Sequence, residues 1–396
     1  MRANRVLSID VFRGLTIFTM VFVNDLAGVQ DLPGWMKHAA ADADAMTFVD
    51  VVFPAFLFIV GMSIPFAVQN RLARDTSQWA LWKHILIRTV GLLVLGVYMV
   101  NSEEMNGEAS LISKSLWDLL FYGSVILLWN QYPVTEKKER RYLHTGLQIL
   151  AVIILLVLPF LFRKGSEDAL TGMTPSWWGI LGLIGWAYLY TMIVFLAFRR
   201  KLYAMVGMLG LFIIVAIGLK DPGLNLPGVL GWLSGQAGNL IHASLCLAGV
   251  ILSQFLLIER EKDNAGGESI RRMLVFGIIL IAAGYFLRPL YGISKIYATP
   301  SWALYSAAIC ALLFPLVYWL VDLRAQTRWA GFLKPAGQNP LLTYILPNIF
   351  IALFGYSFWP EMLSSGIPGL LRSIVFSLFI LGVAALLSRA GIRLRL

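Results

Sequence analysis

Residues 7–29 read LSIDVFRGLTIFTMVFVNDLAGV, and residues 46–68 read MTFVDVVFPAFLFIVGMSIPFAV. Each run is long enough to cross a bilayer, because a transmembrane helix needs about 20 mostly apolar residues. The loop between the two runs carries His38. A polar or ionisable side chain at membrane depth is costly unless it is paired or hydrated, so each one is a candidate functional residue. Those in or beside the two runs are Asp10, Arg13, Asn24 and Asp50.

The whole chain has the composition of a membrane protein. Of its 396 residues, 58% are hydrophobic and 14% are charged, and its mean hydropathy is +0.74. Soluble domains carry about 25% charged residues. We therefore expect an all-α polytopic membrane protein in which residues 1–396 form a single transmembrane domain. The first run lacks a small-residue cleavage site after a short apolar core, so we expect a retained span and not a signal peptide.

Twelve apolar runs have about the length that a transmembrane helix needs. The last two are interrupted by Pro and Gly, so we expect between ten and twelve spans. The predicted spans are 9–29, 47–69, 82–101, 112–131, 143–162, 177–198, 202–219, 238–258, 272–291, 301–323, 340–358 and 367–388.

The basic residues predict the orientation of these spans. If the N-terminus is cytoplasmic, 23 of the 32 Lys and Arg residues fall in cytoplasmic segments, and the acidic loop 101–110 falls outside. This distribution follows the positive-inside rule, and an even number of spans places both termini in the cytoplasm. The net charge of +10 therefore reflects membrane topology, and we do not expect nucleic-acid binding.

With this orientation, polar residues distant in the sequence converge on the extracytoplasmic side. Arg288 and Lys295 either bind an anionic group or are simply solvated, and Ser301 either binds substrate or caps a helix. The residues expected on this side are His38, Asp42, Asp44, Asp50, His242, Arg288, Lys295 and Ser301.

Soluble-enzyme signatures are missing from the chain. There is no Walker loop, no dinucleotide-binding glycine fingerprint and no G-x-S-x-G elbow. The four histidines are scattered, so we expect no metal site. Cys246 and Cys310 lie in apolar runs and are expected to pack as small hydrophobic side chains.

His38 is the strongest single candidate for chemistry. An imidazole titrates near neutral pH, so it can take and return a proton or accept an acyl group. A nearby carboxylate would fix its tautomer, and Asp50 is one candidate, with Asp42 and Asp44 as rivals. The alternative is that His38 is an ordinary solvated loop residue. Asp50 precedes Pro54, which frees a backbone carbonyl and opens a polar notch in the helix.

The other polar candidates have two interpretations each. Asp10 and Arg13 share one helix face and form either an ion pair that locks helix packing or a gate or anchor for a cytoplasmic phosphate. Asn24 either holds a carbonyl oxygen or bonds a neighbouring helix. Gln338 and Asn339, at the start of a helix on the cytoplasmic side, either bind phosphate or act as ordinary caps.

These residues resemble a known family. The string D-x-F-R-G, then N, then H-A, then D-x-V-F-P-x-F-x-F-I-x-G-x-S-I occurs within residues 1–70 and is similar to the heparan-alpha-glucosaminide N-acetyltransferase family. The later segments WWGILGLIGWAYL (177–189), ISKIYATPSWALY (293–305) and GQNPLLTYIL (337–346) resemble its bacterial branch of NagX-like predicted acyltransferases. The residues that carry the first resemblance are Asp10, Phe12, Arg13, Gly14, Asn24, His38, Ala39, Asp50, Val52, Phe53, Pro54, Phe56, Phe58, Ile59, Gly61, Ser63 and Ile64.

The resemblance implies a multi-pass enzyme of the bacterial inner membrane. Such an enzyme takes acetyl from cytoplasmic acetyl-CoA and gives it to the amine of a terminal glucosamine, or a hydroxyl, on the other side. His38 would match the active-site histidine and Asn24 its partner. Residues 40–44 read AADAD where the lysosomal enzyme has a tryptophan, an asparagine and a glycine, which leaves the acceptor open.

Three functions follow from these observations. The first is an acetyltransferase in which His38 acts as general base or carries the acetyl group. The second is a transporter of amino sugars or related saccharides, since twelve spans with both termini inside are also a common carrier layout. The third is a membrane scaffold without chemistry, although it would leave the cost of Asp10, Arg13 and Asp50 unexplained. Small-residue helix faces make a homodimer a further expectation.

Overall fold

The computed structural model describes residues 6–73, 77–199, 201–221, 223–224, 227–259, 265–355 and 358–395. Several of the basic residues that predict the orientation lie outside the described residues: Arg2, Arg5, Arg74, Arg200, Arg260 and Lys262.

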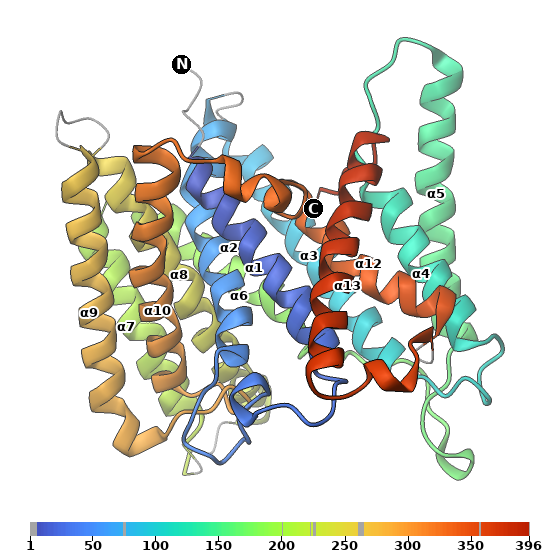
Figure 1. Ribbon diagram of the computed structural model, residues 1–396, viewed down its shortest axis with the longest axis horizontal. Helices are drawn as coiled ribbons and strands as arrows, with labels where there is room; N and C mark the ends of the chain where they lie inside the picture. Colours follow the sequence, from blue (N-terminus) through green and yellow to red (C-terminus); the bar gives the residue numbers. More distant parts are fainter. Residues whose placement is uncertain are drawn as a thin grey trace. The chain divides into compact units, whose positions relative to one another are not determined.

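The chain folds into helices joined by turns and by longer loops (Figure 1). In chain order they are α1 (Leu7–Leu26), α2 (Val49–Leu72), α3 (Gln78–Glu103), α4 (Lys114–Trp129), α5 (Lys138–Leu161), α6 (Ile180–Phe198), α7 (Leu202–Leu219), α8 (Ala237–Glu259), α9 (Ala265–Tyr291), α10 (Pro300–Tyr318), α11 (Lys334–Gln338), α12 (Pro340–Phe354) and α13 (Gly366–Arg389).

The fold class is confirmed as an all-α polytopic membrane protein. Each of the twelve predicted spans coincides with a helix. Within the described residues, ten helices are long and apolar enough to cross a membrane. The predicted spans 112–131 and 340–358 correspond to the shorter helices α4, with 16 residues, and α12, with 15 residues.

The described chain divides into two compact units. Unit 1 comprises residues 1–16, 33–90 and 183–331, and unit 2 comprises residues 17–32, 91–182 and 332–396. In unit 1, α2 packs along α8, which is also covered by α7, while α9 packs against α10 (Figure 1). In unit 2, α4 packs against α5 and α12, and α13 packs against α11 and α12.

The two ends of unit 1 are defined by contacts between distant segments. At one end, the backbone amides of Leu7 and Ser8 donate to the Asp322 carboxylate at 3.1 and 3.0 Å. A carboxylate satisfies the free amides at a helix start and suits the positive end of the helix dipole, so Asp322 caps α1. At the other end, the α1–α2 connection meets the α9–α10 connection through His38 and Lys295.

The contact between α2 and α8 depends on two glycines. A Cβ atom on Gly249 would lie 1.9 Å from the carbonyl oxygen of Phe58, and one on Gly61 would lie 1.7 Å from the carbonyl oxygen of Cys246. The two backbones therefore approach more closely than any side chain permits. Small residues at helix crossings are a main source of packing in membranes, where apolar burial alone gives little.

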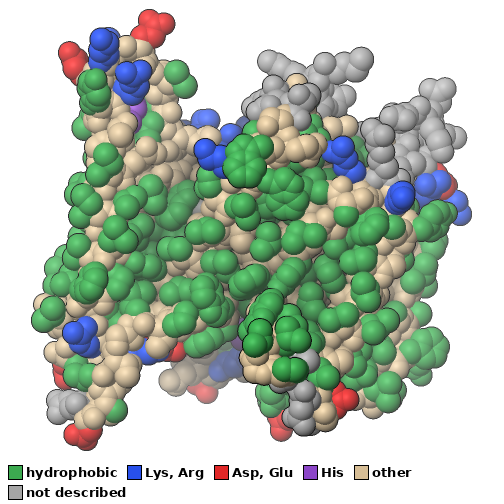
Figure 2. Space-filling model, turned by 180° about the vertical axis from the view of Figure 1, so that it is seen from behind, with side chains coloured by type: hydrophobic (Ala, Val, Ile, Leu, Met, Phe, Trp, Pro, Cys, Tyr) green, Lys and Arg blue, Asp and Glu red, His purple; other side chains and the backbone are tan. Residues whose placement is uncertain are grey.

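Some helices expose continuous apolar surface, as expected for contact with lipid. Along α5, hydrophobic side chains cover most of the helix and basic side chains gather at its start (Figure 2). A soluble monomer rarely exposes apolar patches of this extent, so the exposed face fits a lipid environment. Its large exposed apolar residues are Leu143, Ile149, Leu150, Val152, Ile153, Leu156, Val157 and Phe160.

Candidate active site

The site is built around Asp50 in the first turn of α2. The Asp50 carboxylate is almost fully buried, and its Oδ2 accepts hydrogen bonds from the backbone amides of Thr47 at 3.0 Å and Ala39 at 3.1 Å. The position at the start of α2 also favours negative charge, because free backbone amides and the positive end of the helix dipole lie there. Two backbone donors and the helix start together offset the cost of burying this carboxylate.

His38 binds the other oxygen of the same carboxylate. Its Nδ1 lies 2.6 Å from Asp50 Oδ1, with 44% of the His38 side chain exposed and 2% of the Asp50 side chain exposed. An ionised carboxylate only accepts hydrogen bonds, so the neutral imidazole carries its proton on Nδ1. The lone pair of Nε2 is then available to take a proton from a substrate. This is the arrangement of a general base whose tautomer is fixed by a buried acid.

The ammonium group of Lys295 lies against the His38 ring. Its Nζ is 3.1 Å from Nε2 and 3.3 Å from Nδ1. An in-plane hydrogen bond to Nε2 would place the amine far from Nδ1, so the near-equal distances put it over the ring face. Burial lowers the pKa of Lys295, and the negative charge of Asp50 partly opposes this shift. At this position the amine does not lie along the in-plane lone pair of Nε2.

Buried aromatic residues pack beside Asp50 at the start of α2. The indole Nε1 of Trp302, on α10, donates to the backbone carbonyl of Asp50 at 3.2 Å. His242, on α8, is buried between Phe53 and Trp302, with ring centroids 5.5 and 5.8 Å away. Its Nδ1 is buried and makes no hydrogen bond within the described part of the chain. Trp302 thus anchors the start of α2, and His242 packs between Phe53 and Trp302 in the protein interior.

Asp44 fastens the histidine loop to the start of the α9–α10 connection. Its carboxylate accepts from the backbone amide of Ile293 at 2.8 Å and pairs with Arg288 at 3.2 Å. Asp44 has a φ of 42°, a left-handed conformation that Asp tolerates better than most residues. Ser301 supports the same connection, because its hydroxyl donates to the carbonyl of Gly292. Arg288, Asp44 and Ser301 therefore shape the loops that carry His38 and Lys295.

The remaining candidate residues are exposed or already engaged in other hydrogen bonds. Asp42 is exposed in the histidine loop, whereas Asn24 is exposed on α1 within unit 2. Gln338 is exposed at the end of α11. Asn339 is buried, and its amide binds the C-terminal segment: it donates to Ser388 and to the Ile392 carbonyl and accepts from the amide of Leu394. These bonds favour a fastening role for Asn339 over phosphate binding.

Asp10 and Arg13 form the ion pair that their spacing predicts. Arg13 Nη1 lies 3.0 Å from Asp10 Oδ1, and Arg13 Nη2 donates to the hydroxyl of Ser63 on α2 at 2.7 Å. The pair therefore ties α1 to α2 in unit 1. These contacts join the two helices away from the end of unit 1 that carries His38.

Sequence reasoning missed three partners of the site. Thr47 and Ala39 bind Asp50 through backbone amides, which carry no residue-specific signal, although a Thr three positions before an Asp at a helix start is a recognisable capping pattern. Trp302 carries no signal of its own in the sequence, because tryptophans near the ends of membrane spans are commonly interfacial anchors. Among the described residues, no group of three His, Cys, Asp or Glu side chains is placed to hold a metal ion.

Comparisons with known proteins place the chain in a family. A family model described as "Domain of unknown function (DUF5009)" matches residues 5–238. The chain is also similar to the heparan-alpha-glucosaminide N-acetyltransferases of Mus musculus, 37% identical over 108 residues, and Homo sapiens, 36% identical over 106 residues. Each match covers 27% of this chain and 16% or 15% of the relative, so the chain matches only a small part of their length.

The resemblance inferred from the D-x-F-R-G and D-x-V-F-P strings is thus confirmed as a relationship over part of the chain. Because the family match extends over more than half of the 396 residues, the chain belongs to the DUF5009 family.

Proposed function

We propose that this protein is a membrane acetyltransferase of the bacterial inner membrane. It takes an acetyl group from acetyl-CoA in the cytoplasm and transfers it to the amine of an amino sugar on the extracytoplasmic side. Three findings support this proposal: the helices that suit a membrane, the partial similarity to proteins named heparan-alpha-glucosaminide N-acetyltransferase, and the His38–Asp50 pair. The pair carries the proposal, because it supplies a base at a site open to solvent.

The reaction uses His38 as a general base. The lone pair of Nε2 takes a proton from the acceptor amine while the amine nitrogen attacks the thioester carbonyl. A C–N bond forms, the C–S bond breaks, and the thiolate of coenzyme A leaves and takes up the proton that His38 releases. Asp50 stabilises the imidazolium that forms between these steps, with its 2.6 Å contact to Nδ1.

A second mechanism differs in one intermediate. In it, Nε2 of His38 attacks the thioester itself and carries the acetyl group before the amine accepts it. We favour the general-base mechanism, because it requires the Nε2 lone pair to reach only a proton of the acceptor amine and not the carbonyl carbon of the thioester. Incubation with acetyl-CoA alone, followed by mass spectrometry of the intact protein, separates the two. Acetylated protein that is lost in His38→Ala would contradict the general-base mechanism.

The site also offers groups for binding the acceptor. Lys295 lies against the His38 ring, and Asp42 is an exposed carboxylate in the loop that carries His38. A carboxylate in this position suits the ammonium form of an amino sugar, and an ammonium suits its hydroxyl oxygens. Arg288, Asp44 and Ser301 act by holding the loops, as described above.

The proposal is tested with purified protein, acetyl-CoA carrying a labelled acetyl group, and glucosamine. We expect labelled N-acetylglucosamine from the wild type and a loss of about 10²–10⁴-fold in rate for His38→Ala, the usual contribution of a positioned base. Glu136→Gln, an exposed change in the α4–α5 loop, should keep the wild-type rate. Glucosamine uptake into vesicles without CoA, and no acetylated product, would favour a transporter instead.

A further inference from the structure

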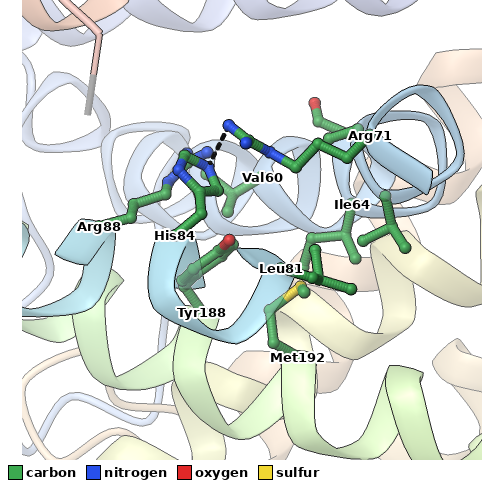
Figure 3. A pocket seen from close by; sticks show the side chains of 11 residues that line it. Val60, Ile64, Arg71, Leu81, His84, Arg88, Tyr188 and Met192 are labelled. Atoms are coloured by element: carbon green, nitrogen blue, oxygen red, sulfur yellow. Dashed lines mark hydrogen bonds between the residues drawn. The ribbon is translucent and has the colours of Figure 1, made fainter. Parts of the chain in front are cut away.

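A second group of charged residues surrounds a pocket at the other end of unit 1. The pocket lies between α2, α3 and α6 and has a cavity volume of about 40 Å³ (Figure 3). Arg71 comes from the last turn of α2, His84 and Arg88 lie one turn apart on α3, and Tyr188 lies on α6. Figure 3 shows the two arginine side chains approaching from either side of His84.

The histidine in this pocket accepts a hydrogen bond from one arginine. Nη2 of Arg71 lies 2.9 Å from Nε2 of His84. A guanidinium only donates, so Nε2 accepts and the neutral ring carries its proton on Nδ1. His84 is therefore a further hydrogen-bond donor in the pocket, and it orients Arg71 without neutralising its charge.

The second arginine has an unused donor. The Nε atom of Arg88 is buried and has no hydrogen-bond partner within the described residues. Its guanidinium stacks over the ring of Tyr188, 4.6 Å from the centroid. A buried donor without a partner costs about 1–3 kcal/mol, so an unpaired group in a native fold needs an explanation. A ligand that accepts from this arginine would supply one.

The pocket lacks a protein counter-ion in the part of the chain that the structure describes. Its lining contains no Asp or Glu, and neither Arg71 nor Arg88 forms an ion pair with a described carboxylate. Arg13 and Arg372, by contrast, are paired with Asp10 and Asp25. Two unneutralised guanidinium groups at the end of a membrane helix favour an anion, and their planar donors match the oxygens of a phosphate.

The position of the pocket relates it to His38. Arg71 follows Asp50 by 21 positions on α2, which corresponds to about 30 Å along a helix. The hydrocarbon core of a bilayer is about 30 Å thick. The pocket and the His38 site therefore lie near opposite ends of one membrane-spanning helix, and the predicted orientation places the pocket on the cytoplasmic side.

We propose that the Arg71–Arg88 pocket is a phosphate-binding site, and that the phosphate it holds belongs to coenzyme A. The second part rests on the proposed function. Anchoring the phosphates at the cytoplasmic end keeps the charged part of the molecule out of the bilayer. The phosphate of a membrane lipid has the same chemistry and is the alternative source.

Binding of coenzyme A to detergent-purified protein tests this assignment by calorimetry. Replacing an arginine that bonds a charged ligand typically weakens binding by about tenfold or more. We expect this loss in Arg71→Gln and in Arg88→Gln, and no change in Arg271→Gln, a control whose arginine is exposed on α9 and pairs with Glu268. Arg71 is exposed at the end of α2, so its variant should fold even if the Arg88 variant does not.

The outcomes separate the assignment from the proposed function. Equal affinity of coenzyme A for the wild type and both variants would overturn the assignment. If coenzyme A fails to bind the wild type but inorganic pyrophosphate binds and requires Arg71, the phosphate site stands and the acetyltransferase proposal fails. If neither binds, and phosphatidylglycerol co-purifies with the wild type but not with the variants, the pocket holds a lipid headgroup and its assignment to coenzyme A is wrong.

Discussion

Single residues decide what His38 can do. Its ring is held by a carboxylate that is buried, bonded by two backbone amides and placed at the start of α2. The two amide hydrogen bonds and the helix start favour the ionised form of Asp50, and the hydrogen bonds also fix the orientation of its carboxylate. An exposed carboxylate such as Asp42 could not fix the ring in the same way, because water would compete for it. Among the three rival carboxylates of the histidine loop, the structure pairs only Asp50 with His38.

Replacing Asp50 with Asn should remove the base without disturbing the loop. The amide nitrogen of Asn can donate to Nδ1, which would place the ring proton on Nε2, where it blocks proton uptake. We expect the rate of acetyl transfer to fall by about 10⁴-fold, as when the orienting acid of a catalytic triad is replaced in this way. Initial rates with labelled acetyl-CoA measure the change. A rate within a factor of a few of the wild type would contradict the role given to Asp50.

Replacing Lys295 with Met should change the dependence of stability on pH. Burial lowers the pKa of Lys295 below its usual 10.5, so the unfolded chain binds more protons than the folded one between the lowered pKa and 10.5. The contribution of Lys295 to the free energy of unfolding therefore rises with pH between the lowered pKa and 10.5. It is least favourable below the lowered pKa. We expect Lys295→Met to unfold at a higher temperature than the wild type at neutral pH.

This difference in unfolding temperature should shrink as the pH approaches 10.5, because the amine of the folded wild type is then neutral. Thermal unfolding of the detergent-solubilised protein across this pH range provides the measurement. A constant difference would show that Lys295 affects stability through packing and not through its charge.

At the scale of elements, the crossing of α2 and α8 holds the base of the site in place. Asp50 begins α2, and His242 lies on α8 near the start of that helix. The backbones meet at Gly61 and Gly249, where a Cβ atom would overlap a carbonyl oxygen. Carbonyl oxygens of a helix cannot move aside as a flexible side chain can. The short distance between α2 and α8 is thus possible only because Gly61 and Gly249 have no side chains.

Gly249→Ala should therefore destabilise the protein. Overpacking a tight contact typically costs about 1–3 kcal/mol, and the yield of folded protein in detergent should fall accordingly. Gly207→Ala is the matched control, because Gly207 lies on α7 and an added Cβ there meets no atom within 4 Å. That variant should be as stable as the wild type or slightly more stable, as alanine favours helix. Equal stability of both variants would contradict the close crossing.

The elements were largely predictable from the sequence, and the site was predictable in part. Hydropathy and length identify a membrane helix directly, so every predicted span coincides with a helix. A carboxylate partner for His38 was expected among Asp50, Asp42 and Asp44, but the sequence did not choose between them; the structure pairs His38 with Asp50. The pairing of Asp44 with Arg288 was not expected, since both looked like ligand-binding groups and only the folded loops bring them together.

The Arg71–Arg88 pocket could not be predicted from the sequence, and the reason is physical. Arg71 and Arg88 contribute to the basic bias that predicts the orientation, and a charge that follows the positive-inside rule needs no further explanation. Their common pocket depends on Tyr188 and Met192 from α6, at least a hundred positions later in the chain. Convergence of this kind is a property of the tertiary structure.

In the whole molecule, acetyl transfer across a membrane requires that the two ends of unit 1 lie on opposite sides of the bilayer. The capping contact between Ser8 and Asp322 lies at one end, and the contact between His38 and Lys295 lies at the other. Helices α2 and α10 each connect the two ends, and both are long and apolar enough to span a bilayer.

Single cysteines should report this sidedness. Cys246 and Cys310 are buried and free, so they should react little with a membrane-impermeant maleimide. We expect Asp42→Cys to be labelled in intact cells and Glu136→Cys, in the exposed α4–α5 loop, to be labelled only after the membrane is opened. Reversed labelling of the two variants would place His38 in the cytoplasm.

The most direct test of the account is acetyl transfer across a sealed membrane. Proteoliposomes that contain labelled acetyl-CoA inside and glucosamine outside would be compared for the wild type and His38→Ala. The account predicts labelled N-acetylglucosamine outside with the wild type and none above background with the variant. Equal product from both proteins would contradict it, as would product that forms only when the donor and the acceptor are on the same side.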